Sequence, residues 1–211
     1  IVESAPYLPR LSRERVKQEL EKSMEQVAQP SRATTLWRSA GALRELIPTL
    51  DAQPAWSLHA ADFVAHPDAT RSAGRKRRRT LLRLATLFVG LAHDATVRTL
   101  RDLRFSNRDV DWVAALAAHA TTLRAAVRAA IAAPTLPPDA ALRRWAAEAG
   151  RTRVADTVRV VLASLAAEAT HGARDGDEEP WGEGDVVALR AAAPARAHAL
   201  YRRVLRVAYR D

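Results

Sequence analysis

Four side chains in the middle of the sequence are of types that could hold a metal ion. His93 and Asp94 are adjacent, and two further histidines, His59 and His119, lie on either side of them in the chain. Imidazole nitrogens and carboxylate oxygens are common ligands of divalent transition metals. Histidines near a helix end more often cap the helix or pack in the core, however, and the sequence favours that interpretation over a metal site.

The strongest charge pattern is a run of seven basic residues with no acidic residue between them. A guanidinium binds phosphate through two parallel hydrogen bonds, so the run predicts contacts to nucleic-acid phosphates, with a solvated loop as the alternative. The last helix carries a second basic group, which could instead stabilise that helix's C-terminus. The predicted RNA contacts are Arg71, Arg75, Lys76, Arg77, Arg78, Arg79 and Arg83 in the run, and Arg202, Arg203 and Arg206 in the last helix.

Two Asp-x-Asp strings are the candidates for a metal-binding carboxylate pair. Asp109 and Asp111 lie at a predicted helix start, where side chains two residues apart point about 200° apart. Asp175 and Asp177 lie in an acidic, glycine-containing stretch that predicts a solvated loop from His171 to Gly184. Helix capping and solvation explain the two strings better than catalysis does. We therefore predict no catalytic residue, and a chain that is inactive by itself.

Composition bounds the class of protein further. The 211 residues carry 33 Lys and Arg against 24 Asp and Glu, a formal net charge of +9. This excess favours a polyanionic partner, although a GC-rich genome also raises the arginine content. Cysteine is absent, which excludes disulfides and fits a cytoplasmic location. No apolar stretch reaches the ~18 residues of a membrane span, so no membrane association is expected.

Apolar residues recur at helical spacing along nearly the whole chain. Ser12 and Ser106 precede such runs and are predicted N-caps, while Gly150 is a predicted helix end. The predicted fold class is all-α, an elongated array of about eight helices without a β-sheet. The predicted helices cover 13–27, the segment from a Ser31 cap to Ile47, 80–94, the segment after Ser106, 139–149, 153–171 and 194–210.

Three short motifs are spread along the chain. The first comprises Ser12, Glu14, Arg15, Val16, Glu19 and Leu20, followed by Pro30, Ser31, Arg32, Leu36, Gly41, Leu43, Leu46, Pro48 and Leu50. The second is Leu103-Arg104-Phe105-Ser106-Asn107-Arg108, and the third runs from Leu200-Tyr201-Arg202-Arg203 to Ala208-Tyr209-Arg210-Asp211. In this order they resemble the neck, body and start of the tail of bacterial CCA-adding tRNA nucleotidyltransferases and the related poly(A) polymerases.

The resemblance implies how the chain is organised. Residues 1–50 would form the neck–body junction, residues 51–133 the body with a degenerate HD-like segment, and residues 134–211 the body and tail helices. The family's catalytic head, with its β-sheet and its Mg²⁺ and ATP or CTP, is expected to lie outside these residues. No cofactor is therefore expected in this chain.

The resemblance also implies a function. The chain would hold the acceptor stem and elbow of tRNA, recognising helical shape and phosphates. The parent enzyme would add C, C and A to the tRNA 3′ end, or CC or A alone, without a template. In the neck, Glu14, Arg15 and Glu19 would steady the helix that supports the nucleotide pocket.

Two other functions stay open. Some members of the resembled family carry a metal-dependent HD phosphohydrolase domain, and His59, His93, Asp94 and His119 would be its remnant. The usual H-D-x-G-K continuation is replaced here by His93-Asp94-Ala95-Thr96-Val97, so this domain would be degenerate. The second alternative is a helical protein-interaction module without an RNA role.

Overall fold

The computed structural model describes residues 11–65, 68, 72–172 and 183–209, with the backbone alone for 183–194. Within these ranges the chain forms helices joined by turns and no β-strand, which confirms the all-α prediction. The described residues form ten α-helices and one 3₁₀ helix, η2, where the sequence predicted about eight helices. They are α1 Arg13–Gln26, α2 Ser31–Ser39, α3 Ala42–Leu46, α4 Pro48–Asp51, η2 Ala55–Phe63, α5 Ala73–Thr86, α6 His93–Asp102, α7 Asn107–Ala132, α8 Asp139–Ala149, α9 Val154–His171 and α10 Glu183–Tyr209.

Serine caps set the starts of two helices at the predicted places. The Ser12 hydroxyl accepts a hydrogen bond from the Arg15 backbone N–H at the start of α1. The Ser106 hydroxyl accepts one from the Asp109 backbone N–H at the start of α7. Each cap satisfies one of the N–H groups that the first turn of a helix leaves without an intrahelical partner.

The start of α2 differs from the prediction. Ser31 is the first helical residue and not the cap, and Pro30 occupies the cap position without a side-chain hydrogen bond. Asp62 from η2 takes over the capping role, because its carboxylate accepts from the Ser31 backbone N–H at 2.9 Å and from the Ser31 hydroxyl at 2.5 Å. A long-range contact thus replaces the local cap that the sequence predicted.

The helix predicted over 80–94 is shifted and interrupted. α5 begins at Ala73 and ends at Thr86, and the chain then turns through Gly90, whose φ of 94° lies in the region that favours glycine. His93 and Asp94 therefore begin α6, although the sequence placed them at a helix end. At the other end of the chain, α10 begins at Glu183 and continues through Pro194. Most of the predicted acidic loop, residues 173–182, lies outside the described residues.

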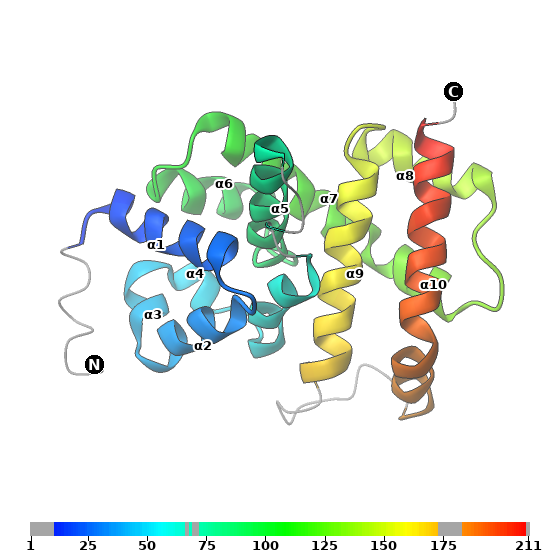
Figure 1. The fold of residues 1–211 in the computed structure, drawn as a ribbon, viewed down its shortest axis with the longest axis horizontal. Helices are drawn as coiled ribbons and strands as arrows, with labels where there is room; N and C mark the ends of the chain where they lie inside the picture. The colour runs from blue at the N-terminus through cyan, green and yellow to red at the C-terminus, as the bar shows by residue number, and fades with distance from the viewer. Residues whose placement is uncertain (1–10, 66–67, 69–71, 173–182, 210–211) are drawn as a thin grey trace.

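The helices form an elongated molecule in which α7 joins the two ends. Figure 1 shows α1 to α4 and α6 toward one end, α8 to α10 toward the other, and α5 between them. α7 has 26 residues, about 39 Å of helix, and packs against α6 and α5 as well as α8, α9 and α10. The buried side chains form one continuous core that includes Leu20 of α1, Phe88 after α5 and Val204 of α10.

Arg83 lies inside this core. Its side chain is 1% exposed, and its guanidinium donates to the backbone carbonyls of Met24 at 3.0 Å, Val27 at 2.9 Å and Val64 at 3.2 Å. Burial lowers the pKa of Arg83, with a smaller opposing effect from Asp62. The guanidinium satisfies carbonyls at the end of α1, and so fixes α1 and the end of η2 against α5.

We predict that Arg83→Met destabilises the protein by about 2–4 kcal/mol, because the stem is kept while several buried carbonyls lose their donors. The free energy of unfolding, measured by urea denaturation, checks this. Arg75→Met on the exposed start of the same helix is the matched control, and should change it by less than about 0.5 kcal/mol. Equal stabilities for the two variants would show that Arg83 does not hold this junction.

Candidate nucleic-acid interface

Residues Arg75 to Arg79 of the basic run lie in the first two turns of α5, where other parts of the chain supply the acids that the run itself lacks. Arg75 is exposed in the first turn, and Arg71 lies outside the described residues. Lys76 donates to the Asp68 carboxylate at 2.5 Å, and this hydrogen bond raises the pKa of Lys76. The solvated loop considered as an alternative is therefore a helix from Ala73 onward.

Arg77 clamps two other helices to α5. Its two terminal nitrogens donate to Glu21 of α1 and Asp109 of α7, each at 2.7 Å. Burial acts to lower the pKa of Arg77, but the hydrogen bonds to Asp109 and Glu21 outweigh it, and the net shift is upward. Such a bridge uses the fork of donors that a guanidinium has and an ammonium lacks.

Arg78 takes part in a second bridge, which joins α5, α9 and α10. Its Nε donates to Asp156 at 2.5 Å, and Asp156 is 1% exposed. Arg159, one turn further along α9, donates to the other oxygen of Asp156 at 3.3 Å. The Arg159 guanidinium also lies 4.6 Å from the ring centroid of Tyr201 on α10. Two arginines thus neutralise one buried carboxylate, which is the condition for burying it at acceptable cost.

The exposed part of the predicted interface is therefore smaller than the sequence implied. The expectation that Arg83 contacts RNA is wrong, because its side chain is 1% exposed within the core. Arg203 pairs with Asp139 of α8 at 2.9 Å. Among the residues that the structure describes, the exposed predicted cations that form no salt bridge to a carboxylate are Arg75, Arg202 and Arg206.

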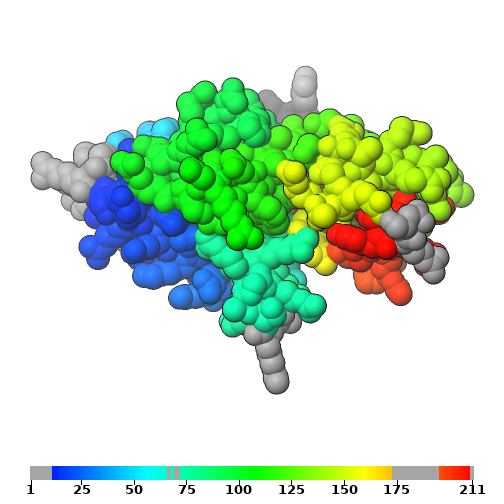
Figure 2. Space-filling view, turned by 90° about the horizontal axis from the view of Figure 1, so that it is seen from above, coloured from blue at the N-terminus to red at the C-terminus, as the bar shows by residue number. Residues whose placement is uncertain are grey.

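These exposed cations lie on two helices. Arg202 and Arg206 are four residues apart on α10 and so share one outward face. Arg79, half-buried, lies four residues after Arg75 on α5. In Figure 2 the residues at the start of α5 project from one side of the molecule, with part of α10 visible further along that side. Like charges four residues apart on a helix repel each other, and a bound polyanion relieves that repulsion.

The neck residues Glu14 and Glu19 form ion pairs on the surface of α1. Glu19 pairs with Lys22 at 2.9 Å. Glu14 reaches Arg104, which belongs to the second motif, at 3.9 Å. All of these side chains are largely exposed, so the ion pairs contribute little to stability. The Glu14–Arg104 pair nevertheless shows that the first motif lies next to the second motif.

The histidines do not gather into one site in the described residues. The His59 ring on η2 stacks on the His171 ring of α9 with centroids 3.9 Å apart. His93 faces Asp94 at 3.4 Å on the exposed start of α6. No group of three or more His, Asp or Glu side chains with metal-binding geometry occurs among the residues that the structure describes. The HD remnant thus has no geometric support there.

The bridging carboxylates are the residues that sequence reasoning missed. Glu21, Asp109 and Asp156 are far from the basic run in the chain, and only the tertiary fold brings them to it. Asp156 could have been recognised from the sequence, because it is an isolated acid within the apolar run that starts at Val154. An acid at such a position requires a cationic partner once the helix is buried.

Comparisons with protein-family models, curated proteins and solved structures found no match to this chain. No helix in the described part of the chain is both long and apolar enough to cross a membrane. The fold and the surface together define an all-helical protein whose basic residues divide into buried bridges and an exposed cationic face.

We predict that protonation of His119 opposes folding at acidic pH. Burial lowers the pKa of His119 below its ordinary 6.5, and the charge of Arg153 lowers it further, while Glu148 opposes this shift and His93 adds the smallest lowering effect. As pH falls below about 6.5, the unfolded chain takes up this proton before the folded chain does, so stability declines. Urea midpoints between pH 8 and pH 5 should fall less steeply for His119→Gln than for the unsubstituted chain.

His198→Gln, on the exposed face of α10, is the control for loss of one imidazole. Superimposable pH profiles for His119→Gln and the unsubstituted protein would contradict the assignment.

Proposed function

We propose that this chain is the tRNA-binding helical portion of a template-independent tRNA nucleotidyltransferase, one that adds CCA, or CC or A alone. The chain by itself is inactive in nucleotide addition. The proposal rests on the motif resemblance, and the structure adds one observation in its favour, which concerns how two of the motifs meet.

The start of the first motif and the second motif, about ninety residues apart in the sequence, lie against each other. Arg13 at the start of α1 pairs with Asp102, just before the second motif, at 3.5 Å. Glu14 pairs with Arg104 at 3.9 Å, and Lys17 lies 5.1 Å from the centroid of the Phe105 ring. Residues that share an ancestral structural role are expected to meet in this way, whereas chance matches have no reason to. This junction is the observation that carries the proposal.

The exposed cations support an RNA partner. Arg75, Arg202 and Arg206 present guanidinium groups from two helices on the outside of the molecule. Their helical scaffold fixes their spacing, so they suit the regular phosphates of a helical acceptor stem and elbow rather than unpaired bases. In this proposal these arginines position the tRNA and carry no sequence information.

The chemistry would belong to a catalytic head with its own β-sheet, which the described residues do not contain. There Mg²⁺ with ATP or CTP would supply nucleotidyl transfer, and no cofactor is assigned to this chain. A cytoplasmic location follows from the same proposal, because that is where tRNA is matured in bacteria.

We predict that tRNA binding weakens steeply with salt and that Arg75→Gln/Arg202→Gln/Arg206→Gln flattens this dependence. Each lost phosphate contact lowers the slope of log K against log salt concentration by about 0.7–0.9, so the triple variant should lose about 2. Fluorescence anisotropy with labelled tRNA between 50 and 300 mM salt measures it. Arg77, Arg78 and Arg83 are left unchanged, because they hold helices together.

The matched control removes three exposed arginines elsewhere, Arg98, Arg143 and Arg144. The two triple variants have the same net charge. An equal slope of log K against log salt concentration in both would mean that tRNA binding follows overall charge and not the face formed by Arg75, Arg202 and Arg206. No binding at low salt would contradict the proposal and favour a protein-interaction module. Phosphodiesterase activity that depends on an added divalent metal would favour the HD alternative.

A further inference from the structure

A pocket unrelated to the exposed cationic face lies between four helices. It encloses about 560 Å³ and is lined by residues from η2, α5, α9 and α10, with Ile131 from the end of α7. This volume falls in the range of sites for small organic molecules, about 300–1,000 Å³. Eleven of the sixteen lining side chains are aliphatic or aromatic hydrocarbons, which makes most of its wall apolar.

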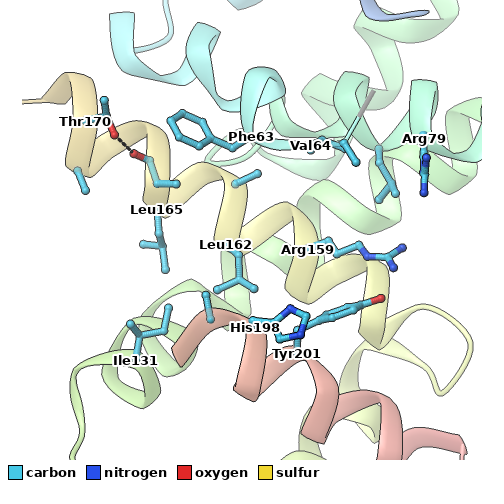
Figure 3. A pocket seen from close by; sticks show the side chains of 16 residues that line it. Phe63, Val64, Arg79, Ile131, Arg159, Leu162, Leu165, Thr170, His198 and Tyr201 are labelled. Carbon is cyan, nitrogen blue, oxygen red and sulfur yellow. Dashed lines mark hydrogen bonds between the residues drawn. The ribbon is translucent and has the colours of Figure 1, made fainter. Parts of the chain in front are cut away.

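The pocket has two chemically different ends. Figure 3 shows Arg79, Arg159 and the Tyr201 hydroxyl toward one end, and Leu165 and Ile131 toward the other. Leu162 lies between them on α9. Such a division matches a ligand with a polar head and an apolar body.

The polar end is positively charged. Arg79 and Arg159 line this end of the pocket. Arg159 shares the Asp156 carboxylate with Arg78, which does not line the pocket. A guanidinium has five N–H donors, so Arg159 retains donors beyond the one it gives to Asp156. Burial raises the pKa of Tyr201, which keeps its hydroxyl protonated and able to donate. An anionic head is therefore favoured over a neutral or cationic one.

The apolar end of the pocket is a poor site for the base of a nucleotide. Thr170 is its polar side chain, and that hydroxyl already donates to the Ala166 carbonyl at 2.8 Å. A nucleobase buried there would leave the polar atoms of its ring edge without partners, which costs free energy. An alkyl or aryl body has no such requirement and gains from every apolar contact.

We propose that this pocket binds a free apolar carboxylate, with the dimensions of a medium-chain fatty acid. The carboxylate accepts hydrogen bonds from Arg79, Arg159 and the Tyr201 hydroxyl, and the chain lies along Leu162 toward Leu165 and Ile131. The arginines on which the proposed RNA contacts rest, Arg75, Arg202 and Arg206, do not line this pocket, whereas Arg79 of the basic run does.

Isothermal titration calorimetry with dodecanoate, below its micelle concentration, tests the site. Saturable binding of one dodecanoate per chain is expected, with dodecanol and dodecyltrimethylammonium at least about tenfold weaker, since neither accepts charge-assisted hydrogen bonds. Arg79→Gln should weaken dodecanoate binding by about tenfold and leave dodecanol unaffected. Arg75→Gln removes the same charge one turn earlier on α5, outside the pocket, and should change the affinity less than about twofold.

Filling the apolar end provides a second, independent variant. Ala166 lines the pocket and is half-buried, so Ala166→Phe should abolish binding of both dodecanoate and dodecanol. Ala126→Phe on the exposed side of α7 is its control. Thermal melts by circular dichroism check folding, and if Ala166→Phe does not fold, the comparison of Arg79→Gln with Arg75→Gln decides. Non-saturable binding, or equal affinity for dodecanoate and dodecanol, would overturn the proposal.

Discussion

The helical start of α5 depends on carboxylates that come from other parts of the chain. Consecutive arginines and a lysine repel one another in a helix, where residues three and four apart are neighbours. Glu21 and Asp109 neutralise Arg77, and Asp156 neutralises Arg78. Because these acids sit on α1, α7 and α9, the same contacts that allow α5 to be helical also join it to three other helices. Arg83 completes this arrangement from inside the core by holding the end of α1.

This arrangement divides the arginines by role. Those whose donors meet carboxylates or buried carbonyls act as structural bridges, a use that suits the fixed fork of the guanidinium. Those left on the outward faces of α5 and α10 keep their charge available to an external polyanion. A third group, Arg79 and Arg159, faces a pocket with apolar walls, where charge is better matched by a single small anion than by a nucleic acid. A count of basic residues cannot separate these roles, because the difference lies in what each side chain faces.

The motif residues and the candidate metal-binding histidines differ in whether the fold brings them together. The motif residues Glu14 and Arg104 meet across a long sequence separation, and their neighbours Arg13 and Asp102 do so too. By contrast, His59 stacks on His171 and His93 turns to its own neighbour Asp94. Spatial convergence is what a shared site requires, and among the described residues the first two motifs show it where the His59 and His93 contacts do not.

The sequence by itself determined the features that local interactions decide. The all-α class, the Ser12 and Ser106 caps and the end of α8 at Gly150 were predictable, because helical periodicity and capping act within a few residues. Three other features were not predictable from the sequence. They are the division of the arginines by role, the Asp62 cap on α2 and the early start of α5. The Asp62 cap and the bridges of Arg77 and Arg78 depend on carboxylates 31 or more residues away in the chain. Only the tertiary structure brings such partners together, since the free energy of a charge depends on its surroundings and not on its place in the chain.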